Sequence, residues 1–325
     1  MEENKKYKLT DETIDIEGKT LYRIESLKDF NGVRKGDKGG YVESEKNLSQ
    51  KGNCWIYDDA CAFDDAIVKD NALLFNESRV HSNANIEKNA RIYGYSMVLD
   101  NACVSDNAHL YENSVVFGNA RVYDNAHIHK SASIFNDAKV YGNACVTDRA
   151  VVFETAYIYG YGYVCDNAQV YGNANVFEFA TIGECAKVFG SSYALGNALI
   201  RGNACVRGYA RVTGDAIVYD DAIIEDYCVV HGNACIGGNV TLKKREDYVT
   251  FYEWWSIYNI TITWTRPNNM WRVGTFYGTA EELVKQAYED DEKFGRQYEH
   301  FMKSIEAIIK EENGGQEVQV NRRDH

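Results

Sequence analysis

Apolar and polar positions follow a six-residue period along the middle of the chain. From Ile56 to Leu242 every sixth residue is apolar, and these 32 positions hold 17 Val, ten Ile, three Leu and two Ala. The fourth residue after each of the first 31 is nearly always small, with 24 Ala and four Ser. Short tandem units cannot bury their apolar side alone and must stack on their neighbours. The pattern therefore predicts an all-β solenoid over residues 56–242.

The block Val-Tyr-Gly-Asn-Ala-Cys, which begins at Val140, shows what each position is expected to do. Side chains alternate between the faces of a strand, so Val140 points inward while Lys139 and Tyr141 point outward. We expect Gly142 and Asn143 to turn the chain, because both residue types tolerate left-handed backbone. The Ala that follows keeps the corner narrow, so that three short strands close one coil.

The tandem motif Val-x-Gly-Asn-Ala-x resembles that of the hexapeptide-repeat family, whose members are left-handed parallel β-helices with three hexads in each coil. The resemblance covers residues 56–242 and implies about ten coils, or a rod of roughly 50 Å at ~4.8 Å per layer. The handedness is implied by the resemblance alone, because crossover connections between parallel strands are generally right-handed.

Residues 1–55 are predicted to cover the open, hydrogen-bonding edge of the first coil. We expect a strand at 21–24, a turn at 38–40, and lids from Tyr41 and Trp55. The run from residue 21 to residue 56, with its Gly-Gly-Tyr-Val and Cys-Trp-Ile segments, is similar to the leader of bacterial and prophage YdcK-like hexapeptide-repeat proteins. This narrower resemblance implies an acyltransferase-like fold and does not imply a reaction.

The six-residue period stops after Leu242. Alternating stretches predict strands at 247–252 and 259–264, a turn at 266–269 and a third strand at 270–277.

Two helices are expected after these strands. Thr279 and Glu282 have the spacing of a capping box, which predicts a helix that begins there and ends near Asp290. Apolar residues at helical spacing predict a second helix over 291–312. The chain is thus expected to comprise an N-terminal β cap (1–55), the β-helix (56–242), a small α+β domain that caps the other end (243–312) and a disordered tail (313–325).

Charge and cysteine usage exclude several function classes. The net charge is −13, and most of it lies in the repeat, so we expect no direct nucleic-acid or membrane ligand. No apolar run is long enough for a membrane span, and the first residues lack the apolar segment of a signal peptide, so the expected location is the cytoplasm. The nine cysteines include no pair separated by three hexads and no Cys-x-x-Cys, which favours reduced structural thiols.

Aromatic residues recur every third hexad, one step after an inward position. Rings in neighbouring coils are expected to stack, which stabilises the ladder by roughly 0.5–1.5 kcal/mol per pair. Alternatively, the columns are contact surfaces for a second subunit, a protein partner or a sugar. The three columns are Tyr57, Phe75, Tyr93 and Tyr111; Phe117, Phe135, Phe153, Tyr171 and Phe189; and Tyr123, Tyr141, Tyr159 and Phe177.

Four residues form a weak metal candidate. His109, His127 and Cys145 share one outward column in consecutive coils, and His129 flanks the same strand as His127. Imidazole and thiolate are ligands of zinc and other transition metals, and γ-class carbonic anhydrases, which look similar in fold, bind zinc through three His. The acidic and Gln partners of that motif are not matched here. We therefore expect solvated or stacked histidines, with no metal and no cofactor.

The function predicted first is that of a non-enzymatic binding or scaffold protein. An acidic row at one corner (Asp148, Asp166, Glu184 and Asp220), expected to be solvated, would face a basic protein partner. The subfamily resemblance includes prophage genes, so a host protein is the expected partner, through mimicry of DNA in one version, and the family resemblance implies homo-oligomers. The alternative is an acyltransferase that acts on a small molecule. It is weakened because no coil carries the inserted loop near which such enzymes place their catalytic His.

Overall fold

The computed structural model describes residues 5–252 and 260–320. The chain forms two compact units. The first comprises Met1–Asn233 and Gly237–Arg245, and the second comprises Ala234–Ile236 and Glu246–His325.

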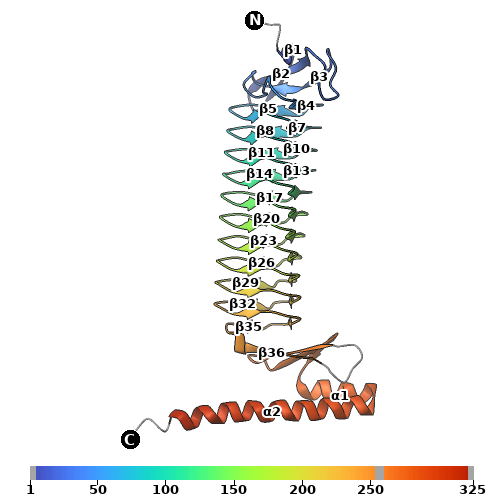
Figure 1. The fold of residues 1–325 in the computed structure, drawn as a ribbon, viewed down its shortest axis with the longest axis vertical. Coiled ribbons are helices and arrows are strands. Elements are labelled where there is room, and N and C mark those ends of the chain that lie inside the picture. Colours follow the sequence, from blue (N-terminus) through green and yellow to red (C-terminus); the bar gives the residue numbers. More distant parts are fainter. Residues whose placement is uncertain (1–4, 253–259, 321–325) are drawn as a thin grey trace. The chain divides into compact units, whose positions relative to one another are not determined.

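The first unit contains a stack of coils, seen as the rungs of Figure 1. Its strands, from β4 (Trp55–Ile56) to β35 (Thr241–Leu242), are each two residues long and succeed one another at every hexad, so each ends on an inward position of the repeat. Each strand pairs in parallel with the strand three hexads further along the chain, as Cys103 does with Arg121. The result is a parallel β-solenoid of about 11 turns, which confirms the predicted fold class with one turn more than expected. Its left-handed sense stays the implication of the resemblance.

The interior of the coils is lined by aliphatic side chains. All inward positions from Ile56 to Leu242 are 0% exposed, including Ala62 and Ala194, and so are the alanines at the corners. Burial of a Val or Ile side chain contributes roughly 1.5–3 kcal/mol, and this gain is repeated three times in every coil. The strict hexad therefore corresponds to one continuous core.

The turns differ in one respect from the prediction. Left-handed backbone occurs at the third position of the block, as at Gly142 (φ 72°), Asp148 (φ 61°) and Glu178 (φ 56°), whereas Asn143 at the fourth position does not have a positive φ. The chains pass so closely there that a Cβ on Gly142 would lie 2.9 Å from the Gly160 nitrogen. The expectation that Asn143 serves the turn through left-handed backbone is wrong.

The asparagines instead form amide ladders along the corners. In the longest ladder each Nδ2 donates to the Oδ1 of the Asn in the next coil, at 3.1–3.2 Å. Other ladders end on Asp137, Asp215 or Asp221, which accept from the preceding Asn at 2.8–3.1 Å. A carboxylate accepts hydrogen bonds and cannot donate one, so an Asp ends such a ladder. The longest ladder consists of Asn53, Asn71, Asn89, Asn107, Asn125 and Asn143.

The N-terminal strands extend one sheet of the coil. β1 (Tyr7–Ile16), β2 (Lys19–Ser26) and β3 (Lys38–Val42) precede β5 (Cys61–Ala62) in a 14-stranded sheet. The strand expected at 21–24 is therefore longer, and residues 38–40 belong to β3 and are not a turn. The two glycines are needed because β3 passes close to the first coil. A Cβ on Gly40 would lie 2.2 Å from the Ala60 carbonyl oxygen.

Several large side chains close the first coil. Trp55 is 1% exposed and Tyr41 is 5% exposed, so both are covered, as expected of lids. Lys6 joins them, which no pattern in the sequence indicated. Its Nζ is buried and donates to the Cys54 carbonyl at 2.8 Å and contacts Cys54 Sγ at 3.1 Å, while burial lowers the pKa of Lys6.

The second unit has an antiparallel sheet of four strands, preceded by a 3-10 turn at Arg245–Asp247. The strands are β36 (Tyr248–Tyr252), β37 (Thr261–Thr265), β38 (Met270–Val273) and β39 (Phe276–Gly278). The single strand predicted at 270–277 is therefore two strands, because the chain turns at Gly274 with φ 56°. Residue 259, where the second strand was expected to begin, lies outside the described residues.

Two helices follow the sheet. α1 (Ala280–Asp290) begins at the predicted capping box, in which the Thr279 N–H donates to Glu282 Oε2 at 2.8 Å and the Glu282 N–H donates to Thr279 Oγ1 at 3.3 Å. α2 (Glu292–Val320) continues past residue 312 through the segment expected to be a disordered tail. Residues 321–325 lie outside the described part of the chain.

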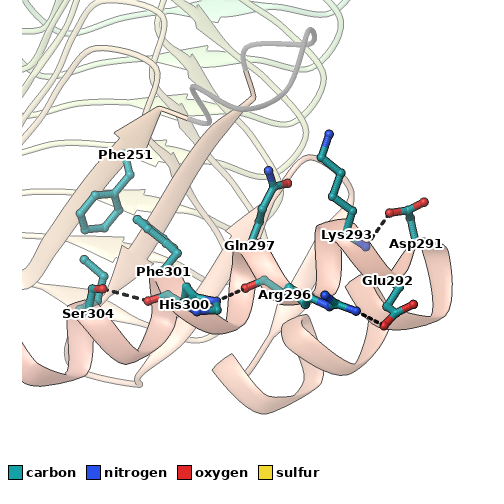
Figure 2. Close-up of a pocket in the computed structure, with 10 residues that line it drawn as sticks. Phe251, Asp291, Glu292, Lys293, Arg296, Gln297, His300, Phe301 and Ser304 are labelled. Atoms are coloured by element: carbon teal, nitrogen blue, oxygen red, sulfur yellow. Dashed lines mark hydrogen bonds and ion pairs between the residues drawn. The ribbon is translucent and has the colours of Figure 1, made fainter.

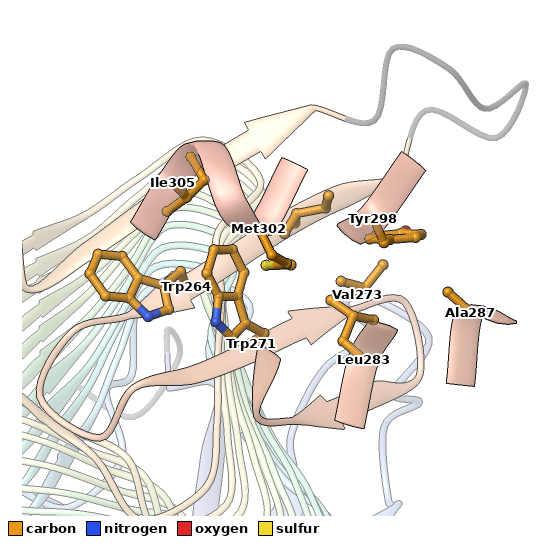
Figure 3. Packing of buried hydrophobic residues seen from close by; sticks show 9 residues of the cluster. Trp264, Trp271, Val273, Leu283, Ala287, Tyr298, Met302 and Ile305 are labelled. Atoms are coloured by element: carbon orange, nitrogen blue, oxygen red, sulfur yellow. The ribbon is translucent and has the colours of Figure 1, made fainter. Parts of the chain in front are cut away.

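The core of the second unit is mixed aromatic and aliphatic (Figure 3). Trp264 and Trp271, which are 4% and 3% exposed, have ring centroids 5.8 Å apart. Leu283 of α1 and Met302 of α2 pack into the same cluster. The sheet and both helices thus share one core.

Candidate functional site

Two shallow depressions of ≈ 300 Å³ each lie on the coils and share Lys130. Together they are made by the first residues of strands in the 11-stranded sheet and by residues one to three steps beyond those strands, in consecutive coils. The first is lined by Glu112, His129, Lys130, Cys145, Thr147 and Tyr163. The second, at the adjoining corner, is lined by Lys130, Ser131, Asp148, Arg149, Asp166 and Asn167.

The histidines predicted as a group do come together on this face. His109 and His127 have ring centroids 5.2 Å apart, and His127 and His129 have centroids 5.7 Å apart. His109 Nδ1 is 2.6 Å from the Tyr111 hydroxyl. The Tyr111 ring in turn stacks on His129 at 4.5 Å. Four rings therefore hold one another in fixed orientation beside the first depression.

Burial favours the neutral forms of three groups here, His109, His129 and Cys145. Burial, with the neighbouring His127, lowers the pKa of both His109 and His129. Burial, with Asp148 nearby, raises the pKa of the Cys145 thiol. At neutral pH His109 and His129 therefore present uncharged imidazoles that can accept a proton, and Cys145 presents a thiol and not a thiolate.

The candidate metal ligands were His109, His127, His129 and Cys145. Among the described residues, no group of three or more His, Cys, Asp or Glu side chains is arranged to hold a metal ion. The contacts of the histidines are ring stacking and the His109–Tyr111 hydrogen bond, and these orient imidazoles.

The three aromatic columns stack as predicted. Neighbouring centroids are 4.6–5.2 Å apart and the planes lie within 13° of parallel. Their rings are partly buried. The column of Tyr57 lies along the 11-stranded sheet, that of Phe117 along the 14-stranded sheet, and that of Tyr123 along the 10-stranded sheet. Stacking between coils accounts for much of their ring surface, and their role in partner binding stays a prediction.

The acidic row has a structural role that the sequence analysis did not foresee. Asp166 Oδ2 accepts from the backbone N–H of Glu184 at 2.8 Å, and Glu184 Oε2 accepts from that of Gly202 at 2.8 Å. Asp220 Oδ2 accepts from the Gly238 N–H at 3.1 Å. Each carboxylate therefore fixes the turn of the next coil, as well as carrying charge.

Two members of the row also contact cations: Asp148 forms an ion pair with Lys130, and Glu184 Oε1 lies 4.0 Å from the Arg201 guanidinium. The contact with Lys130 is the main reason that the pKa of Asp148 lies below its ordinary value. Lys130 thus partly neutralises Asp148, which was expected to be solvated.

Two exposed aromatic pairs were missed. Tyr161 and Phe179 stack at 5.0 Å, and so do Tyr209 and Tyr227, on two different corners of the coil. They stand at the fourth position of the block, where Asn is usual. Aligning every third hexad of the sequence would have shown them as breaks in the asparagine ladders.

The second unit carries a larger groove of ≈ 1000 Å³ between β36 and α2 (Figure 2). Phe251 and Phe301 form its apolar side, with ring centroids 5.1 Å apart. Along α2 the Arg296 guanidinium pairs with Glu292, and His300 Nδ1 lies 2.7 Å from the Arg296 carbonyl oxygen. Most of these polar groups are therefore engaged along the helix itself, whereas the buried Oε1 of Gln297, which also lines the groove, has no hydrogen-bond partner among the described residues.

Three further observations bear on function. Within the described ranges, no helix combines the length and the apolarity that a membrane span needs. No family model matches the chain. A protein of Escherichia coli (strain K12), described as the uncharacterized acetyltransferase YdcK, is 42% identical over 59 residues, which are 18% of this chain and 18% of that protein. The chain therefore matches less than a fifth of the length of that relative. The unbroken hexads, the parallel solenoid and this short match all fit a hexapeptide-repeat β-helix.

Proposed function

We propose that the protein transfers an acyl group from a thioester to a small acceptor at the depression beside His129. The observation that carries this proposal is the place of His129 in the lining of that depression, where its ring is held by stacking on Tyr111 at 4.5 Å and burial lowers its pKa. The relative described as an acetyltransferase supports the reaction class.

In this reaction His129 acts as the general base. It accepts the proton of an acceptor hydroxyl or amine, the acceptor atom attacks the thioester carbonyl carbon, and the carbon–sulfur bond breaks. The proton then passes to the departing thiolate, so that the enzyme is regenerated. A base with a pKa below its ordinary value is already neutral at pH 7, which suits this role. Cys145 is not the nucleophile in this proposal, because its raised pKa keeps it a thiol.

The depression is too small to enclose a coenzyme-sized donor, which agrees with a donor that lies along the surface. Two cations line the adjoining corner, Lys130 and Arg149, and either could bind the phosphates of the donor. Lys130 is held by Asp148, so Arg149 is the better candidate for phosphate binding.

The test is thiol release from acetyl-coenzyme A, measured with a panel of hydroxyl and amine acceptors. A His129→Gln variant should lose about 100-fold or more in rate, the usual range for removal of a general base. His81→Gln is the matched control, because His81 also stacks on an aromatic ring, Phe63, but on another sheet. Activity should fall as the pH drops through a pKa below 6.5, because protonated His129 cannot accept a proton. Equal rates for the two variants, or no release above background, would refute the proposal.

A second candidate function is the binding rod, and the exposed aromatic pairs favour it. The four rings are between 55% and 75% exposed, and they protrude where the repeat normally places a short polar side chain. This second candidate includes a basic protein partner in the cytoplasm and assembly into homo-oligomers. It also includes a prophage origin and mimicry of DNA.

A further inference from the structure

The two exposed aromatic pairs share a motif that spans two coils. In each, a Gly-Tyr dipeptide lies directly beside an acidic residue and an aromatic residue of the next coil. Tyr161 donates its backbone N–H to the Glu178 carbonyl at 2.7 Å, and Tyr209 donates to the Asp226 carbonyl at 2.8 Å. Gly160 and Gly208 permit this approach, because a Cβ on either would lie 3.0 Å from the next acidic residue's nitrogen.

Each motif has two exposed aromatic rings and one acidic residue, which directly precedes the second aromatic residue in the sequence. Tyr161 and Phe179 are 55% and 60% exposed, and Tyr209 and Tyr227 are 56% and 75% exposed. The ring planes of the pairs are within 9° and 3° of parallel. At the first corner the equivalent residues in the coils before and after the pair are Asn143 and Asn197. Neither has a ring, so the outer face of each ring in the pair has no aromatic neighbour in the column.

Among the described contacts neither Glu178 nor Asp226 forms an ion pair, although Arg207 and Lys243 interact with Asp226 at longer range. Glu178 uses Oε2 to accept from the Gly196 N–H at 2.7 Å, and a carboxylate has further acceptor sites. At the second corner, Arg207 and Lys243 are engaged by Glu225, which is a different carboxylate from Asp226.

The protein itself shows what such tyrosines attract. Within the first unit, cations lie over four tyrosine rings, at 4.2–5.8 Å from the ring centroid. Cation–π attraction is strongest for a guanidinium or ammonium that also loses water. The four pairs are Arg23 with Tyr41, Lys139 with Tyr157, Arg201 with Tyr219, and Arg211 with Tyr193.

We propose that the Gly-Tyr corners at Tyr161 and Tyr209 are docking points for a basic segment of a partner protein. An arginine or lysine side chain of the partner stacks on an uncovered ring, and its charge pairs with Glu178 or Asp226. Anionic ligands are disfavoured by the charge of the coils. This inference does not depend on acyl transfer and gives the binding-rod candidate a partner class.

The test uses a fluorescein-labelled nonamer of arginine and measures its fluorescence anisotropy against the full chain. Replacing Tyr161, Phe179, Tyr209 and Tyr227 with Ala leaves every charge in place, so it separates ring stacking from general charge attraction. The expected loss of affinity is about two- to fivefold for each corner. Tyr95→Ala is the matched control, since Tyr95 is 59% exposed but its hydroxyl is held by Glu77. It should bind as the parent does.

A second variant guards against misfolding of the first. Glu178→Gln with Asp226→Asn keeps all rings, and it should also weaken binding and reduce its salt dependence. Unchanged affinity in both variants would overturn the proposal, and so would equal binding of a nonamer of aspartate. If His129→Gln still binds the arginine nonamer, this surface is separate from the proposed acyl-transfer site. If His129→Gln no longer binds the nonamer, the two sites are not independent.

Discussion

The coils and the C-terminal unit bury their apolar residues in different ways. In the coils each inward side chain is a small or branched aliphatic that lies over another of its kind in the neighbouring coil, and every one is fully buried. In the C-terminal unit the core is assembled from the sheet and two helices around Trp264 and Trp271. Contacts of the coil are local and repeated, so its stability is approximately a sum over units. Contacts of the C-terminal core are unique, so loss of one is felt by the whole core.

The largest effect is expected from a change of register in the coil. Insertion of one residue within 140–146 would turn inward side chains outward in that coil, whereas deletion of three whole hexads (140–157) joins Lys139 to Ile158 in phase. We expect the insertion to abolish cooperative unfolding of the coil and the deletion to preserve it. Far-UV circular dichroism during urea unfolding distinguishes them. Equal losses would show that the hexad does not govern the fold.

A single substitution should be more damaging in the C-terminal unit. Trp271→Ala removes a side chain that is 3% exposed and should cost about 3–5 kcal/mol. The control is Val140→Ala, since alanine already occupies inward positions 62 and 194. Calorimetry should show a strongly lowered transition for the first variant and a smaller decrease for the second, because Val140→Ala removes only two methyl groups. The comparison fails if Val140→Ala is the more harmful.

The amide ladders give a finer test of the coil. Asn107 accepts from Asn89 and donates to Asn125, each at 3.1 Å. Asn107→Asp keeps the first hydrogen bond and sets two acceptors against each other at the second, so it should cost about 0.5–1.5 kcal/mol in the free energy of unfolding. The reverse exchange, Asp137→Asn, should be tolerated because Asp137 only ends its ladder. Equal effects would mean that the direction of the ladder is irrelevant.

The smallest effect is expected at an ion-pair cluster in the last coils. Hydrogen bonds from Lys243 and Arg207 lower the pKa of Glu225. Its contribution is therefore present above the carboxyl pKa of the unfolded chain and is lost as the pH falls through the lower folded pKa. Glu225→Gln should cost ~0.5 kcal/mol at pH 7 and nothing once the pH is below that folded pKa. A difference that persists unchanged in acid would exclude this ion-pair effect.

The sequence predicted what its periodicity encodes. Every inward position, the stacking of the Tyr57, Phe117 and Tyr123 columns, and the capping box at Thr279 follow from spacing alone. The closing of β3 on the first coil did not, because Gly39 and Gly40 act as close-packing residues only when a neighbouring chain is present. The same holds for Lys6, whose partner Cys54 is distant in sequence.

The candidate site was only half visible from the sequence. The histidine column could be predicted because its members recur at every third hexad. The depression could not be predicted, because it is lined by side chains from neighbouring strands, such as Cys145 of β19 and His129 after β16. It also depends on the direction in which the Lys130 side chain points. The ladder function of Asn143 was missed because the residue type also suits turns, and only the backbone angles separate the two roles.

Because the hexad is unbroken, the residue number alone gives the position of a side chain on the surface of the coils. Moving three hexads along the sequence moves one layer, ~4.8 Å, along the coil, and moving one hexad leads to the next face in almost the same layer. A Gly-Tyr corner or a histidine column could therefore be moved to another coil or face by substitutions alone, with no change to the backbone. The spacing between two surface features is correspondingly a whole number of coils and faces. Duplication of a coil would therefore increase the distance between two features without changing the features themselves.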